Sequence, residues 1–128
     1  GYRNRWVRTR PLEQANGMHA APSADPGIGF DLGVSNTNVV GHAGRIYSLG
    51  EVGLPYELDR DLNTLREGNF DGRLITNMTA HPKIDPRTGE MLFFGYDFGP
   101  VFLRYHALSA QGQLVKTIEI ETPRPTMM

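Results

Sequence analysis

The stretch GRIYSLGE at residues 44–51 returns in pattern as GEMLFFGY at residues 89–96. The two stretches lie 45 residues apart, and at the same offset Pro55 meets Pro100. Each copy predicts a turn, a strand, a glycine, a loop, a proline, and then a strand, a turn and a strand. A period of about 40–45 residues with about four strands per unit is typical of a β-propeller blade. The repeat therefore predicts an all-β chain built of consecutive blades.

The chain is short for such a fold. Its 128 residues hold fewer than three units of this period, whereas known propellers close with about four or more. It also begins at Gly1 rather than Met, and it stops at Met128 without a turn, a cap or a polar tail. We therefore expect residues 1–128 to be one partial domain of about two to three blades, truncated at both ends.

The composition excludes several classes of protein. Hydrophobic residues make up 39% and charged residues 21%, with a net charge of −1 and a mean hydropathy of −0.38. Nucleic-acid binding usually needs a concentrated basic surface, and this composition does not suggest one. The absence of cysteine excludes disulfides and thiolate metal sites and fits a reducing compartment, so we expect a cytoplasmic location. No apolar run approaches the ~18 residues of a membrane span. Residues 1–10 are rich in arginine and have no apolar core, so the sequence does not indicate a signal peptide.

Strands and turns account for most of the pattern. The 15 glycines and 9 prolines are spread along the chain, as expected for short strands joined by turns. Helical patterns are nearly absent, and residues 59–65 predict one turn at most. Residues 20–33 predict a loop. The expected strands are 38–40, 45–49, 90–94, 101–108 and 114–120, with turns at 42–44, 85–89 and 109–112.

Three of the four histidines suit roles other than metal binding. His19 is expected in a solvated loop. His42 lies at a tight turn, where a hydrogen bond from its Nδ1 side to the backbone is expected. His106 alternates with Phe102 and Arg104 along a strand, which favours a position on the blade surface over a ligand.

His81 differs because it opens the second repeat unit, in the stretch TAHPK at residues 79–83. The innermost strand of a propeller blade lines the central channel, and Pro82 restricts the backbone of His81 to extended conformations. A rigid histidine facing the axis suits a metal ligand. One histidine does not make a site, so a non-ligand role stays open on these grounds alone.

The sequence TAHPKIDP at residues 79–86, with FFGY at 93–96, resembles the first iron-ligand motif of the carotenoid cleavage oxygenases. That family includes lignostilbene dioxygenases and a retinoid isomerase. The resemblance is colinear, covers nearly the whole chain and is weakest at residues 11–34. The other matching segments are residues 2–9, which resemble the family's early strand, and residues 36–40, 42–45, 46–58 and 125–128.

The resemblance implies a seven-bladed β-propeller with a non-haem Fe(II) on its axis, held by four histidines. His81 matches the first ligand, and the second is expected immediately after Met128. Outer glutamates of the family hydrogen-bond ligand histidines and fix their tautomers, as metal sites require. Glu51 matches one of these glutamates, and its partner is expected to be one of the later histidines rather than His81. A plain loop carboxylate is the other interpretation of Glu51.

The implied reaction is oxidative cleavage of a conjugated C=C bond by O₂, giving two carbonyl products. The implied substrates are carotenoids or apocarotenoids, apolar polyenes that reach the iron through a hydrophobic tunnel. The alternatives are a stilbene-cleaving dioxygenase, an isomerase of the same family, and a non-catalytic propeller that only binds. Because one histidine cannot hold Fe(II) tightly, we expect the isolated chain to be inactive. The candidates for the tunnel are Phe98, Phe102, Met127 and Met128, with packing inside a blade as the competing role.

The first ten residues are rich in arginine. A solvated or ion-paired strand is the favoured interpretation, and contact with anionic lipid at a membrane surface is the second. The sequence indicates no protein partner. The residues concerned are Arg3, Arg5, Arg8 and Arg10.

Overall fold

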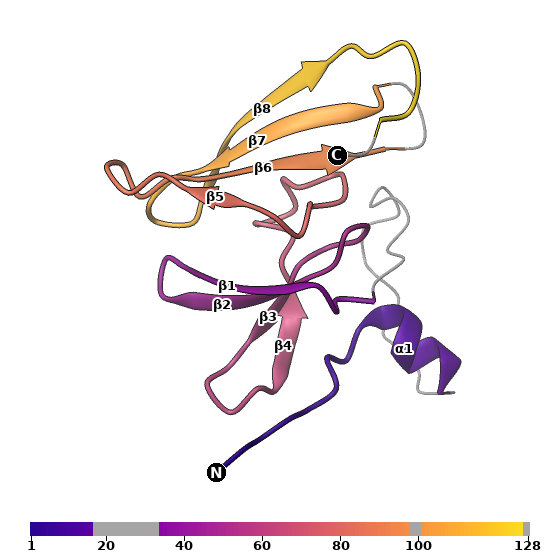
Figure 1. The fold of residues 1–128 in the computed structure, drawn as a ribbon, viewed down its shortest axis with the longest axis vertical. Helices are drawn as coiled ribbons and strands as arrows, with labels where there is room; N and C mark the ends of the chain where they lie inside the picture. Colours follow the sequence, from indigo (N-terminus) through magenta and orange to yellow (C-terminus); the bar gives the residue numbers. More distant parts are fainter. Residues whose placement is uncertain (17–33, 98–100, 127–128) are drawn as a thin grey trace.

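The computed structural model describes residues 1–16, 34–97 and 101–126. Eight strands form two antiparallel four-stranded sheets, each connected in simple chain order (Figure 1). The all-β expectation is confirmed for these two sheets. The first sheet comprises β1 (Asn38–His42), β2 (Arg45–Leu49), β3 (Tyr56–Leu58) and β4 (Thr64–Glu67). The second comprises β5 (Lys83–Ile84), β6 (Met91–Tyr96), β7 (Leu103–Leu108) and β8 (Leu114–Ile120).

Five of the eight strands lie close to where the sequence predicts them, and the sequence predicts no residue range for β3, β4 and β5. Predicted strands 45–49 and 114–120 match β2 and β8, and the others differ from the observed strands only at their ends. The tight turn between β1 and β2 has positive φ at both central residues, 50° at Ala43 and 74° at Gly44. That backbone matches the twist of the flanking strands in a two-residue hairpin. Each repeat unit thus becomes one four-stranded sheet.

The N-terminal segment departs from expectation. Residues 1–9 form no strand, and a helix that the sequence pattern did not predict, α1 (Arg10–Ala15), follows them. The Thr9 side chain accepts a hydrogen bond from the Leu12 backbone N–H at 3.3 Å, which caps this helix. Pro11 in its first turn favours the same start. An extended segment becomes a strand only where another strand pairs with it, and within the described residues none pairs with residues 1–9.

The main core lies between the two sheets and is completed by the chain that joins β4 to β5 (Figure 1). A fully buried apolar side chain of this kind contributes about 1.5–3 kcal/mol relative to exposure. The core residues are Tyr47, Leu49, Leu54, Phe70, Leu74, Met78, Ala80, Met91, Phe93, Leu108 and Leu114, with Val40 packed against them.

The two sheets stack in the same orientation. Tyr47 of β2 and Phe93 of β6 both point into the shared core. At the 45-residue offset, however, the equivalent of Tyr47 is Leu92, which lies next to Phe93 and so on the opposite face of β6. Equivalent faces of the two sheets therefore point the same way rather than toward each other. The face of the second sheet that points away from the core is therefore equivalent to the face of the first sheet that packs into the core.

Residues 74–80, which we call the inter-sheet segment, carry the chain from the first sheet to β5. They have no regular secondary structure, yet all of them except Ile75 are buried. The segment passes against Gly95 so closely that a Cβ there would lie 2.3 Å from Thr76 Oγ1 and 2.5 Å from the Asn77 carbonyl oxygen. Only glycine permits this approach.

We predict that Gly95→Ala destabilises the protein by about 1–3 kcal/mol, the usual effect of forcing extra atoms into a packed interior. Gly41→Ala is the matched control, since a Cβ at Gly41 has only one neighbour within 4 Å, the Arg45 carbonyl at 3.9 Å. Thermal unfolding followed by circular dichroism measures both. Equal melting temperatures for the two variants would contradict the packing assigned to Gly95.

Candidate metal centre

His81 leaves the inter-sheet segment two residues before β5. Its side chain is 60% exposed, and its Nε2 lies 2.7 Å from the Glu51 Oε1. Glu51 belongs to the loop between β2 and β3 and is partly exposed itself. Among the described residues Glu51 therefore pairs with His81, and its pairing with one of the later histidines stays a prediction. The two side chains that the sequence singled out form a carboxylate–imidazole pair.

Backbone contacts explain why the pair forms. The Met78 N–H donates to the Gly53 carbonyl at 2.9 Å, which ties the inter-sheet segment to the Glu51 loop. The Asn38 side-chain amide donates to the Ala80 carbonyl at 2.8 Å, one residue before His81. The loop and the segment are thus held side by side, so His81 is the imidazole within reach of Glu51.

The described residues fit one corner of a metal site. The exposed imidazole of His81 has the donor chemistry that first-row divalent metals accept, and the adjacent carboxylate can orient it. Among the residues that the structure describes, however, no group of three or more His, Cys, Asp or Glu could hold a metal ion. A complete centre would need further ligands in addition to His81.

His42 is the last residue of β1 rather than part of the turn. Its Nε2 lies 3.0 Å from the Gly89 carbonyl oxygen in the β5–β6 turn. Its buried Nδ1 has no hydrogen-bond partner among the described residues. The expected bond to the backbone exists, but through the other ring nitrogen and to the second sheet.

His106 is fully buried, so its expected place on the blade surface is wrong. Its ring stacks on Phe93 with centroids 5.0 Å apart, its Nε2 lies 3.1 Å from Thr76 Oγ1, and its Nδ1 lies 2.9 Å from Thr117 Oγ1. Burial, and then the nearby Arg104 charge, lower the pKa of His106 from 6.5 to about 4. The alternation along β7 is as expected, but the face that carries His106 turns inward, where the inter-sheet segment covers it.

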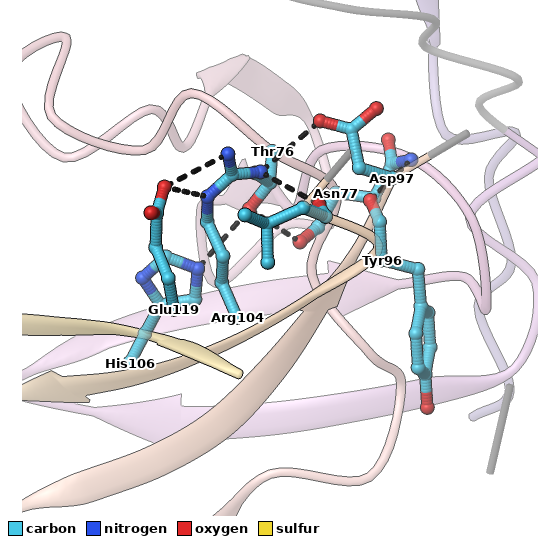
Figure 2. A network of polar contacts seen from close by, with 8 residues as sticks. Thr76, Asn77, Tyr96, Asp97, Arg104, His106 and Glu119 are labelled. Carbon is cyan, nitrogen blue, oxygen red and sulfur yellow. Dashed lines mark hydrogen bonds and ion pairs between the residues drawn. The ribbon is translucent and has the colours of Figure 1, made fainter. Parts of the chain in front are cut away.

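Arg104 lies two residues from His106 on the same face of β7 (Figure 2), and its charge is the second cause of the lowered pKa of His106. Its guanidinium contacts the Asp97 carboxylate at 3.1 Å and the Glu119 carboxylate at 3.1 Å. These two carboxylates balance the arginine charge, while the imidazole next to it stays neutral.

The remaining predicted residues are distributed as follows. Phe102 is half-buried just before β7, and its place in a tunnel stays a prediction. Arg3, Arg8 and Arg10 pair with Asp61, Glu13 and Glu67, which confirms ion pairing for these three arginines. None of the helices described is long and apolar enough to span a bilayer. The expectations for His19, Phe98, Met127 and Met128 lie outside the described residues.

Sequence reasoning missed the polar residues of the inter-sheet segment, whose side chains contact β6 and β7. Thr76 and Asn77 are buried, 5% and 7% exposed. A run of polar residues in a segment without regular periodicity predicts an exposed loop. The one sign of their burial in the sequence is that two apolar residues, Leu74 and Met78, flank them.

The chain matches known proteins along its whole length. The family model described as Retinal pigment epithelial membrane protein matches residues 1–128. The carotenoid cleavage oxygenase of Mycobacterium tuberculosis is 40% identical over 129 residues, covering 99% of this chain and 26% of the relative. Isoeugenol monooxygenase of Pseudomonas nitroreducens is 40% identical over 103 residues, covering 72% of this chain and 22% of the relative.

Solved structures agree with this. Lignostilbene dioxygenase of Pseudomonas brassicacearum superposes with a TM-score of 0.74 at 32% identity, covering 94% of this chain and 28% of that one. Cobalt-substituted apocarotenoid oxygenase of Synechocystis superposes with a TM-score of 0.63 at 28% identity, covering 74% of this chain and 22% of that one. The fold is thus that of a class of β-sheet oxygenases.

Within that class, the chain belongs to the carotenoid cleavage oxygenase family. It spans 26% of the length of the Mycobacterium tuberculosis relative and 28% of the lignostilbene dioxygenase chain.

The buried neutral His106 predicts a pH-dependent stability. Between pH 6.5 and about 4 the unfolded chain binds a proton that the folded chain does not, so stability falls as the pH falls through this window. The loss is about 2 kcal/mol from pH 7 to pH 5 and approaches about 3 kcal/mol below pH 4. Urea unfolding at several pH values measures it. A His106→Gln variant should lose this component, and an unchanged pH dependence in that variant would contradict the assignment.

Proposed function

We propose that this chain is part of a non-haem Fe(II)-dependent dioxygenase that cleaves a conjugated C=C bond of a carotenoid or apocarotenoid to two carbonyl products. The observation that carries the proposal is the His81–Glu51 pair, at 2.7 Å, in a chain of the carotenoid cleavage oxygenase family. Relatives named as a carotenoid cleavage oxygenase and as carotenoid 9,10(9',10')-cleavage dioxygenases support the substrate class.

His81 would supply one of four histidine ligands through its Nε2 lone pair. For that nitrogen to face a metal, its contact with Glu51 must open, and the imidazole is exposed enough to turn. Glu51 would then orient a ligand histidine, as outer carboxylates do in metal sites generally. When bound, the iron would supply the site at which O₂ and the substrate double bond react. A cobalt-substituted relative supports a metal centre.

The stacking of the two sheets supports a propeller as the complete architecture, which the family resemblance gives as seven-bladed. Because equivalent faces point the same way, the stack does not close on itself and can accept further sheets. The far face of the second sheet already carries an apolar pair, Phe94 and Tyr105, with ring centroids 5.6 Å apart. Ile118, beside Tyr105 in the register, is 41% exposed there. A third sheet would bury these side chains.

A stilbene-type substrate is the second candidate. Lignostilbene dioxygenase covers more of this chain, 94%, and has a higher TM-score than the apocarotenoid oxygenase. Isoeugenol monooxygenase is also a relative. The two names refer to a stilbene and to isoeugenol, aromatic compounds whose double bond is conjugated to a ring and which are shorter than a carotenoid. Phe102, half-buried just before β7, would contribute to the tunnel whose shape selects between these substrates.

The decisive experiment uses the full-length protein loaded with Fe(II) under ¹⁸O₂. We expect a carotenoid or apocarotenoid to give carbonyl products that both carry label, and His81→Ala to lose bound iron and activity together. Lys83→Ala is the control, since Lys83 is an exposed residue two positions away. Cleavage of stilbenes alone would select the second candidate. Unlabelled products would rule out dioxygenation, and full iron content in His81→Ala would remove His81 from the ligand set.

A further inference from the structure

The inter-sheet segment is fixed on both sides by hydrogen bonds. The Thr79 N–H donates to the Phe94 carbonyl at 2.9 Å, and the Asn77 side-chain amide donates to the Tyr96 carbonyl at 3.3 Å. On the first sheet, Asn38 holds the Ala80 carbonyl. Since buried backbone groups must find partners, these contacts determine the path of the segment and the point at which His81 emerges.

Thr76 also joins the segment to the second sheet, through a contact between its side chain and that of His106. The Thr76 hydroxyl donates to the Asn77 carbonyl at 3.2 Å, so its oxygen is left to accept from His106 Nε2–H. Nδ1 of the ring then accepts from the Thr117 hydroxyl. A neutral imidazole has one donor and one acceptor, and this arrangement uses both.

The imidazole is itself rigid. It stacks on Phe93 at an interplanar angle of 26°, and it is fully buried. The close approach of Gly95 adds to this, because a Cβ there would lie 2.9 Å from His106 Nε2 and 2.3 Å from Thr76 Oγ1. Thr76 is therefore held against a fixed group of the second sheet, five residues before His81.

We infer that Thr76 and His106 are positioning residues for His81, which set the place where its imidazole leaves the inter-sheet segment. The inference rests on the proposed role of His81 as a metal ligand. His106 does not contact that site, so it acts only through Thr76 and the buried backbone between them. Loss of the Thr76–His106 bond would let the segment shift and would weaken metal binding.

Two threonines on opposite sides of the same ring provide the test. Thr76→Val removes the bond on the segment side, and Thr117→Val makes the same chemical change on the β8 side. Both variants should lower the urea midpoint of unfolding, because each removes one bond to His106. Only Thr76→Val should weaken Co(II) binding, by about tenfold or more, as loss of outer-shell support does in other metal sites. Thr76→Ser, which keeps the hydroxyl, should restore it.

The measurement is titration of the full-length apoprotein with Co(II), followed by the visible absorption of the bound ion. Equal affinities in Thr76→Val and Thr117→Val would overturn the inference, and so would a failure of Thr76→Ser to restore binding. His81→Ala separates the two claims. If it binds Co(II) like the wild type, the proposed ligand role fails and the inference fails with it. If it loses binding while Thr76→Val does not, the positioning role alone is wrong.

Discussion

The structure depends on the burial of a chain segment that has no regular secondary structure. Residues 74–80 run between two sheets, and six of these seven residues are buried. Outside helices and sheets, buried N–H and C=O groups must be satisfied one by one, and unsatisfied groups cost about 1–3 kcal/mol each. Hydrogen bonds from the segment to Gly53, Phe94, Tyr96 and Asn38 satisfy several of its buried polar groups. They join the two sheets into one unit and also fix the exit of His81.

The same constraint gives the candidate site its geometry. The segment is tied to the loop that carries Glu51, so a carboxylate and an imidazole separated by 30 residues meet at 2.7 Å. Neither side chain is held by packing, since both are partly or largely exposed. The rigid part of the site is the backbone beneath it. The side chains at its surface are exposed, so they would be free to turn if a metal were bound.

Much of this could be predicted from the sequence. The turns at residues 42–44 and 109–112 and the repeat of 45 residues located the strands, because turn chemistry and alternation are local properties. The expectation that His81 and Glu51 are site residues came from the resemblance of their segments to a family, and it stays a prediction. The helix at Arg10–Ala15 was missed although Thr9 and Pro11 mark its start, because none of its residues is buried and no apolar periodicity exists to show it.

What could not be predicted depends on contacts distant in the chain. The alternation along β7 places Arg104 and His106 on one face, but only the inter-sheet segment decides that this face is the inner one. Likewise, the polar sequence of Thr76 and Asn77 predicts a solvated loop, whereas partners on β6 and β7 allow it to be buried. A fully buried neutral histidine, with a pKa of about 4, follows from packing that no local pattern encodes.

The central claim is that the inter-sheet segment delivers His81 as a metal ligand. Diffraction at the cobalt absorption edge, from crystals of the full-length protein loaded with Co(II), tests it directly. We expect an anomalous peak about 2 Å from the His81 Nε2, with the Glu51 carboxylate no longer on that nitrogen. A cobalt peak elsewhere, with His81 still paired to Glu51 at 2.7 Å, would contradict it.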